Sequence, residues 1–475
     1  MCLYRIDLKV NLGLPKARFY CQIPPQYINI ENENLTLNKK MDKLNIQPFL
    51  DNAKFSAFHK NVLFWTALII IFDGYDLVIY GTVLPVLMKT WGLTPVQAGS
   101  LASYALFGMM FGAFIFGTIA NRIGTKRAII ICIVLFSGFT FLCGFAQTPT
   151  TFAIFRFIAG LGIGGVMPNA VSLMAEYAPK NIRNTLVTAM FSGYAVGGIM
   201  SALLGMYLIP NFGWQAVFYV GIIPLLLLPF IIKFLPESLN FLVKTGKKAE
   251  ANAILTQLDP AYTPQNDTVL EISTTTANET SVSDLFKNNR LLSTLMFWLA
   301  FFMCLLVVYG LNSWLTKLIM TKPEYKDNLS LSLTFLLVLN IGAIFGAIGG
   351  GRLADKYDLR KTVLIFFAIG SVAIGLLGYS SSFLLYVLMF IAGAATTGNQ
   401  IVLYTLVAQY YPTLLRSTGI GWASGIGRIG AIIGPVLGGL LLSWKLPFEQ
   451  NFFAFGLAAA IAAVAIIFVD YRNEK

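Results

Sequence analysis

Hydrophobic positions along the chain gather into twelve long runs that are separated by shorter polar segments. Each run has about 20 residues or more, which is enough for a helix to cross the roughly 30 Å hydrocarbon core of a bilayer. We therefore predict an all-α membrane protein with twelve transmembrane helices. The runs lie at 61–88, 96–120, 128–147, 150–174, 185–209, 213–235, 291–319, 329–351, 361–380, 383–409, 417–443 and 450–470.

Polar segments divide these runs into two groups of six. Residues 236–290 are rich in Asn, Thr, Ser and charged residues, with a short helix expected at 247–258. We predict two six-helix bundles, at 61–235 and 291–470, joined by a flexible cytoplasmic linker at 236–290. Residues 471–475 are expected to form a cytoplasmic tail.

Residues 1–60 are interpreted as a cytoplasmic N-terminal tail. They lack the positively charged start, apolar core and cleavage site of a secretory signal peptide. Met41 begins a plausible shorter protein, so residues 1–40 are expected to be either a disordered extension or an overcalled start.

The two halves of the chain repeat short motifs at a nearly constant spacing. The patterns Ala-Gly, Tyr-x-Pro and Arg-x-Thr begin at Ala159, Tyr177 and Arg183 and recur 233 residues later. The basic loop at 117–127 is echoed at 351–361. A half-length repeat in a hydrophobic chain predicts a pseudo-symmetric transporter whose site lies between the halves.

Composition and charge support the membrane interpretation. Hydrophobic residues make up 56% of the chain and charged residues 12%, whereas a soluble domain has about 25% charged residues. If both termini lie on one side, that side has 27 of the 34 Lys and Arg residues, while five lie on the other side and two within spans. The net charge of +12 therefore reflects the positive-inside rule. Both termini are predicted to be cytoplasmic, and no nucleic-acid partner is expected.

The polar residues exclude several function classes. The five cysteines have no metal-ligand spacing, and His59, the only histidine, precedes the first predicted span. No nucleophile–base pair or metal set is visible. The chain is therefore predicted not to be an enzyme and to need no metal or cofactor.

Two acidic residues lie in the middle of the first predicted helix. Asp73 and Asp76 share one helix face, because they are three residues apart. A carboxylate is costly to ionise in low dielectric, and a second one close by raises the cost further. We predict that this pair couples transport to protons; the alternative is a pair that only hydrogen-bonds neighbouring helices. Gly74 between them is expected to let the helix loosen.

Two arginines also lie within predicted spans. Arg156 stays charged and needs an anion, which could be Asp76, Asp73 or a substrate carboxylate held by its guanidinium fork. A permanent Arg–Asp strut between helices remains the alternative. Arg428 could bind substrate as well, but a structural role in closing the cytoplasmic side is favoured.

The loops at the cytoplasmic side are predicted to act in gating. Asp355 is expected to latch helices through charges, whereas Asn121 stands at the corresponding position of the first loop and should latch through hydrogen bonds. The gating candidates are Asn121, Arg122, Arg127, Asp355, Lys356, Arg360, Glu176, Arg183, Arg416 and Arg428.

Three segments resemble the aromatic acid:proton symporter family of the major facilitator superfamily. They are Phe-Asp-Gly-Tyr-Asp at 72–76, the glycine-rich run that starts at Arg156, and Tyr-Pro-Thr-Leu-Leu-Arg-Ser-Thr-Gly at 411–419, within a likeness that covers about 61–470. The resemblance implies that protons and a small aromatic acid anion, of the benzoate or hydroxybenzoate type, enter together by alternating access. It also implies a multi-pass protein in the lipid bilayer of a bacterial inner membrane, and we expect a monomer.

An aromatic acid would need side chains that stack on its ring and amides that orient its polar groups. Together with Arg156, the candidates near the expected cavity are Tyr75, Tyr80, Tyr309, Asn312, Trp314, Asn340, Asn399, Gln400 and Tyr404.

Four other functions remain open from the sequence. A muconate-type dicarboxylate would fit the same charges. Sugar or polyol uptake is suggested by Pro-Glu-Ser at 236–238, which resembles a sugar-porter motif, although a neutral sugar does not explain Arg156. The others are a drug:proton antiporter and a membrane receptor that binds the acid without accumulating it.

Overall fold

The computed structural model describes residues 43–259, 262–263, 269–271, 282–326, 328–412 and 415–470. Within these residues, 12 helices are long and apolar enough to cross a membrane, which confirms the twelve predicted spans. The proposed start at Met41 and the tail at 471–475 lie outside the described residues.

Six spans form the N-terminal bundle. Thr94 and Thr148 cap two of these helices, because each side chain accepts a hydrogen bond from a backbone N–H of the first turn and a proline follows at once. The first helix begins before its apolar run, since Ser56 and His59 form a capping box. The elements are α3 (Ala57–Trp91), α4 (Pro95–Ile123), α5 (Thr125–Cys143), α6 (Pro149–Tyr177), α7 (Arg183–Phe212) and a sixth span made of α8 (Gln215–Tyr219), η2 (Val220–Ile222), α9 (Ile223–Leu226) and α10 (Leu228–Phe234).

The C-terminal bundle has the same number of spans. Its tenth span in chain order differs from the continuous α-helix that we predicted, because a π-helical segment, η6 (Ala394–Gly398), joins two α-helices. The elements are η3 (Val282–Phe286), α13 (Leu291–Ile319), η4 (Pro323–Tyr325), α14 (Leu329–Lys356), α15 (Leu359–Leu376), η5 (Leu377–Tyr379), α16 (Ser382–Gly393), α17 (Asn399–Tyr410), α18 (Arg416–Ser443) and α19 (Phe448–Ile467).

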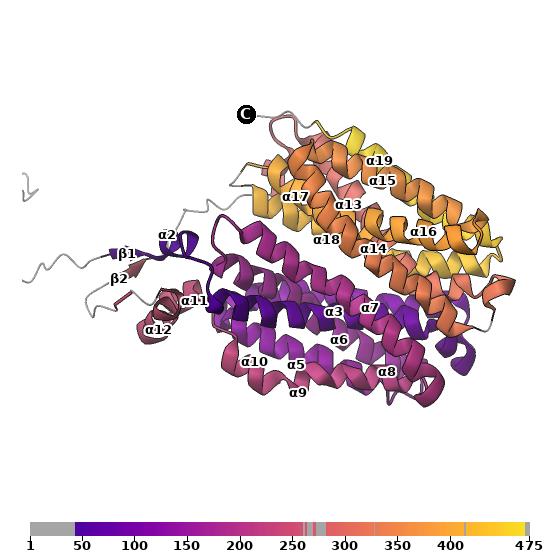
Figure 1. Ribbon diagram of the computed structural model, residues 1–475, viewed down its shortest axis with the longest axis horizontal. Helices are drawn as coiled ribbons and strands as arrows, with labels where there is room; N and C mark the ends of the chain where they lie inside the picture. Colours follow the sequence, from indigo (N-terminus) through magenta and orange to yellow (C-terminus); the bar gives the residue numbers. More distant parts are fainter. Residues whose placement is uncertain are drawn as a thin grey trace, which may run out of the picture.

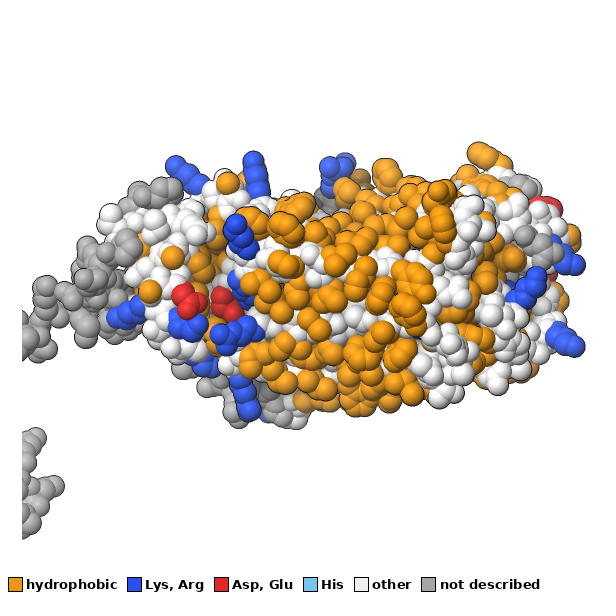
Figure 2. Space-filling view, turned by 90° about the horizontal axis from the view of Figure 1, so that it is seen from below, with side chains coloured by type: hydrophobic (Ala, Val, Ile, Leu, Met, Phe, Trp, Pro, Cys, Tyr) orange, Lys and Arg blue, Asp and Glu red, His pale blue; other side chains and the backbone are white. Residues whose placement is uncertain are grey.

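The two bundles lie side by side with their helices running in roughly the same direction (Figure 1). The first and last described residues of the chain and the linker all lie at one end, which we call the linker end; the opposite end is the far end. Figure 2 shows a belt of hydrophobic side chains across the middle of this face, with most of the visible Lys and Arg side chains toward its two ends. This distribution is the one that a membrane-spanning protein requires.

The linker contains more structure than its composition predicts. The expected short helix is present as α12 (Lys248–Leu258), and α11 (Leu239–Lys244) precedes it. A strand from the N-terminal tail, β1 (Lys43–Asn45), pairs in parallel with β2 (Val269–Glu271), and α2 (Ile46–Asp51) follows β1. The all-α prediction therefore holds for the spans but not for this small pair of strands outside them.

The bundles make direct backbone contact in their far halves. A Cβ added at Gly81 of α3 would lie 1.9 Å from the carbonyl oxygen of Asn312 in α13, and one added at Gly99 of α4 would lie 2.4 Å from that of Pro435 in α18. Nearby, the Ser103 hydroxyl donates to the carbonyl of Ile432 at 2.6 Å. Glycine thus lets helices of the two bundles approach to backbone distance there.

Gly74 does not loosen α3, contrary to our expectation. The helix is continuous from Ala57 to Trp91. A Cβ at Gly74 would lie 2.2 Å from the carbonyl oxygen of Tyr194 in α7, and Gly197 of α7 packs equally closely on α3. The glycine allows α3 and α7 to pack backbone against backbone, and this packing positions Asp73 and Asp76.

We expect Gly74→Ala to reduce the amount of folded protein strongly. The new methyl group would collide with backbone, which cannot rotate away, so α7 must move; such overpacking costs about 1–3 kcal/mol or more. Thermal unfolding of the purified protein in detergent measures the effect. Gly138→Ala is the matched control, because nothing lies within 4 Å of a Cβ there. Equal stability of both variants would show that α7 shifts at little cost.

Candidate functional site

A buried ion pair connects the first and fourth spans. Nη1 of Arg156 in α6 lies 3.0 Å from both carboxylate oxygens of Asp76 in α3, and Nη2 donates to the Asp76 backbone carbonyl at 3.2 Å. Both side chains are only 2% exposed. Thr140 of α5 also donates to the Asp76 carboxylate, at 2.5 Å. Of the anions that the sequence offered to Arg156, the structure shows Asp76 as its partner.

Asp73 has different surroundings, although it lies on the same helix one turn closer to the linker end. It is fully buried, and neither carboxylate oxygen has a hydrogen-bond partner among the described residues. Arg428 of α18 is close enough to act on it electrostatically but forms no ion pair with it. A buried carboxylate without a partner carries a large desolvation cost, and the neutral acid does not. The two aspartates are therefore suited to different roles.

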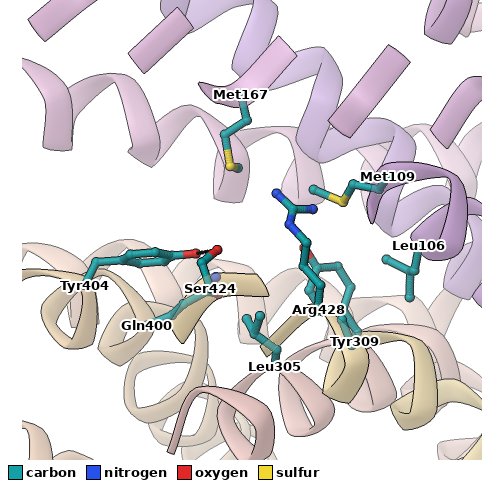
Figure 3. Close-up of a pocket in the computed structure, with 10 residues that line it drawn as sticks. Leu106, Met109, Met167, Leu305, Tyr309, Gln400, Tyr404, Ser424 and Arg428 are labelled. Carbon is teal, nitrogen blue, oxygen red and sulfur yellow. Dashed lines mark hydrogen bonds between the residues drawn. The ribbon is translucent and has the colours of Figure 1, made fainter. Parts of the chain in front are cut away.

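A cavity of about 370 Å³ lies between the bundles, on the linker-end side of this ion pair. We call it the linker-side cavity. Figure 3 shows the Arg428 side chain rising toward the N-terminal bundle between Met167 and Met109, with Tyr404 and Ser424 to one side. The hydroxyl groups of Tyr404 and Ser424 lie 2.9 Å apart. The lining residues are Leu106, Met109, Met167, Leu305, Tyr309, Gln400, Tyr404, Ser424, Arg428 and Ala431.

A second cavity of about 280 Å³ lies toward the far end, beside Arg156. We call it the far-side cavity. It shares Leu106 and Tyr309 with the linker-side cavity, so these two side chains stand between the cavities. The lining residues are Leu77, Tyr80, Ala102, Ala105, Leu106, Arg156, Tyr309, Asn312 and Ser313.

Six of the residues that we predicted to bind substrate line one of the cavities: Arg156, Tyr80, Tyr309, Asn312, Gln400 and Tyr404. Four others are not among the lining residues of these two cavities, so their role in substrate binding stays a prediction. Tyr75 donates to the carbonyl of Val217, Trp314 to that of Pro435, Asn340 to that of Leu336 and Asn399 to that of Val363.

Arg428 lines the linker-side cavity and makes no hydrogen bond or ion pair in the described part of the chain, so its favoured role in closing the cytoplasmic side stays a prediction. The sequence reasoning also missed Met109, Met167 and Ser424. Ser424 lies four residues before Arg428 and therefore on the same helix face, which was a usable signal. The two methionines gave no signal, because they look like ordinary helix residues.

In the second basic loop, two of the predicted gating residues contact groups other than Asp355, whose predicted latch stays a prediction. Arg360 donates to the carbonyls of Ile466 and Ile467 at the C-terminal end of α19, where a cation is favourable. Lys356 lies 5.4 Å from the ring centre of Tyr357. The side chain of Asp355 lies outside the described part of the structure.

In the first loop, the expected hydrogen-bonded latch is absent from the described residues: Asn121, Arg122 and Arg127 are exposed and make no hydrogen bond there. Arg416 is likewise exposed and unbonded within that part of the chain. Arg183 instead pairs with Asp51 of the N-terminal tail at 2.5 Å.

The junction between the N-terminal bundle and the linker uses two carboxylates. Glu176 accepts hydrogen bonds from the Ser238 hydroxyl and the Asn240 backbone N–H, both at 2.8 Å. Glu237 accepts from the backbone N–H of Lys126 at the start of α5, at 2.9 Å. The Pro-Glu-Ser segment at 236–238 is thus part of a structural anchor and gives no support for a sugar site. Among the described residues, no group of three His, Cys, Asp or Glu side chains could hold a metal ion.

Comparison with protein families matches residues 66–357 and 338–475 to the major facilitator superfamily. The chain is 46% identical to the benzoate transport protein of Acinetobacter baylyi, over 91% of this chain and 94% of that protein. It is 36% identical to the gentisate transporter of Corynebacterium glutamicum, over 84% of each chain. It is 32% identical to the 4-hydroxybenzoate transporter PcaK of Pseudomonas putida, over 91% of this chain and 97% of that one.

Solved structures show the same fold. The xylose transporter XylE from E. coli, in a partially occluded inward open conformation, matches with a TM-score of 0.68 at 18% identity, covering 88% of this chain and 99% of that one. A bacterial homolog of the human lysosomal transporter Spinster, in an inward-facing and occupied conformation, also matches with a TM-score of 0.68, at 19% identity, covering 88% and 97%.

Proposed function

The chain belongs to the major facilitator superfamily and to its aromatic acid transporters, and we propose that it imports a small aromatic carboxylate, of the benzoate or hydroxybenzoate type, together with protons. The observation that carries the proposal is the buried Asp76–Arg156 pair beside the unpartnered Asp73, at the interface of the two bundles. The names of the relatives support benzoate-like acids.

The excess of Lys and Arg at the linker end supports a cytoplasmic position for this end, with the protein in the inner membrane of a bacterium. The bundles touch in their far halves, and the larger cavity lies toward the linker end. This arrangement fits an inward-facing state of a transporter that works by alternating access.

Transport of the acid is coupled to the proton because only the two together keep the site electrically neutral. A proton from outside neutralises Asp76, which releases Arg156, and the substrate carboxylate then takes the place of the aspartate. The loaded site is again neutral overall, so the bundles can rock inward without exposing an unpaired charge to low dielectric. Either ligand alone leaves one charge uncompensated: the acid adds an anion to a complete pair, and the proton leaves Arg156 alone. Asp73 offers a second carboxyl that can hold a proton during the same step.

Uptake of labelled benzoate and 4-hydroxybenzoate into cells that produce the chain tests this proposal. We expect accumulation above the external concentration, and we expect a protonophore to abolish it because the proton gradient supplies the driving force. Cells without the chain and labelled xylose serve as controls. Accumulation that persists with the protonophore would contradict proton coupling, and no uptake of either acid would contradict the substrate class and direct the assay to muconate.

A further inference from the structure

We propose that the linker-side cavity is a second carboxylate subsite, centred on Arg428, which receives the aromatic acid after it leaves Arg156. The inference rests on the proposed function and adds a second binding position for the acid. The proposed exchange of charges at Asp76 and Arg156 does not itself require a second binding position. Four observations support it.

Arg156 has little capacity left for a substrate in this structure. Its Nη1 binds both oxygens of Asp76, its Nη2 binds the backbone carbonyl of the same residue, and its buried Nε has no partner. While Asp76 stays ionised, an acid carboxylate would have to displace an existing buried ion pair. An acid in the inward-facing state is therefore better placed at another cation.

Arg428 is that cation. It is partly exposed to the linker-side cavity and makes no hydrogen bond or ion pair within the described ranges. Arginine does not lose its charge in proteins, and its planar guanidinium can bind a carboxylate through two parallel hydrogen bonds. Asp73 lies near enough to interact with Arg428 but leaves the guanidinium unpaired. The site thus has a free donor set for one carboxylate.

The rest of the cavity suits an aromatic ring with polar substituents. Met109 and Met167 flank Arg428 (Figure 3), and methionine sulfur makes favourable contacts with aromatic rings. Gln400 also lines the cavity, and its amide has no hydrogen-bond partner among the residues that the structure describes. A ring hydroxyl would find a donor and an acceptor in this amide.

The partition between the cavities suits a transfer from one binding position to the other. Leu106 belongs to α4 of the N-terminal bundle and Tyr309 to α13 of the C-terminal bundle, and both line each cavity. Because they come from different bundles, rocking of the bundles changes the gap between them. The acid would pass this gap once on its way from Arg156 to Arg428.

Binding measurements on the purified full-length chain test the subsite. We expect Arg428→Gln to weaken benzoate binding, measured by isothermal titration calorimetry in detergent, by about tenfold or more, because a hydrogen bond to a charged group contributes about 1.5–3 kcal/mol. Arg428→Lys keeps the charge but loses the fork, so it should restore part of the affinity. Lys248→Gln is the control, because Lys248 is an exposed cation of α12 at the same end.

Gln400→Leu provides a second variant that leaves no charge unpaired. We expect it to weaken binding of 4-hydroxybenzoate several-fold and binding of benzoate less, since only the former has a ring hydroxyl. Thermal unfolding of every variant identifies loss of fold. Binding that is unchanged in folded Arg428→Gln, or unchanged for both acids in Gln400→Leu when Arg428→Gln does not fold, would overturn the subsite. Absence of binding to the unmodified chain would instead contradict the proposed function.

Discussion

Asp73→Asn is expected to abolish proton-driven accumulation of the acid while the protein stays folded. The asparagine has the same shape but cannot exchange a proton. Both carboxylate oxygens of Asp73 lack partners among the described residues, so the substitution breaks no hydrogen bond that the structure shows. A loss of transport would therefore reflect lost coupling rather than lost packing.

Two assays on one preparation separate coupling from binding. In proteoliposomes, accumulation driven by an imposed proton gradient should fall to the level of empty vesicles. Exchange of labelled for unlabelled benzoate, which needs no net proton movement, should continue. Asp358→Asn is the matched control, because Asp358 caps α15 outside the spans and asparagine caps helices equally well.

The result for Asp73→Asn also shows whether one or both aspartates are needed for proton coupling. Full accumulation in Asp73→Asn would show that Asp76 carries the coupling proton without help from Asp73. Full accumulation in Asp73→Asn and in Asp76→Asn, tested separately, would contradict proton coupling through this pair.

Arg156→Gln is expected to cause the largest loss of stability. The substitution removes the cation from Asp76, whose carboxylate then keeps only the hydrogen bond from Thr140 among the contacts seen here. Removal of one partner from a buried ion pair costs about 3–5 kcal/mol, because a charge remains buried without compensation. We expect a clearly lower unfolding temperature for the purified protein and no accumulation of the acid.

The double variant Arg156→Gln/Asp76→Asn distinguishes the ion pair from the individual side chains. It removes both charges, so most of the lost stability should return, while accumulation stays absent because the carboxylate has no cation at this position. A double-mutant cycle of unfolding free energies measures the coupling between the two residues. A single Arg156→Gln variant as stable as the unmodified protein would show that Asp76 is not ionised in the resting state.

The sequence was sufficient for the features that depend on local chemistry. Each transmembrane helix must satisfy its own backbone hydrogen bonds and present apolar side chains to lipid, so twelve apolar runs predict twelve spans. The same reasoning identified Asp73, Asp76 and Arg156, because a charge inside an apolar run is too costly to occur without a purpose. Even the pairing of Asp76 with Arg156 could be anticipated, since only side chains at a similar depth in the membrane can contact each other.

The tertiary structure decided everything that depends on the rotation of helices and on contacts between distant segments. Neighbouring residues on an α-helix point about 100° apart, so Gln400 faces the linker-side cavity whereas Asn399 binds the backbone of α15. No periodic pattern could reveal this difference, because helices buried on most sides have weak amphipathicity. Arg428 was identified as a charge, but only the packing of α18 against α4 and α13 shows that it lines a cavity.

The contacts at the linker end were also beyond the sequence. β1 pairs with a strand more than 200 residues away, and Arg183 pairs with Asp51 of the tail instead of a loop partner. Such polar segments have many possible partners of similar energy. The composition of this chain determined that it crosses the membrane and which charges it must bury there; only the packing of the helices determined which side chains those charges meet.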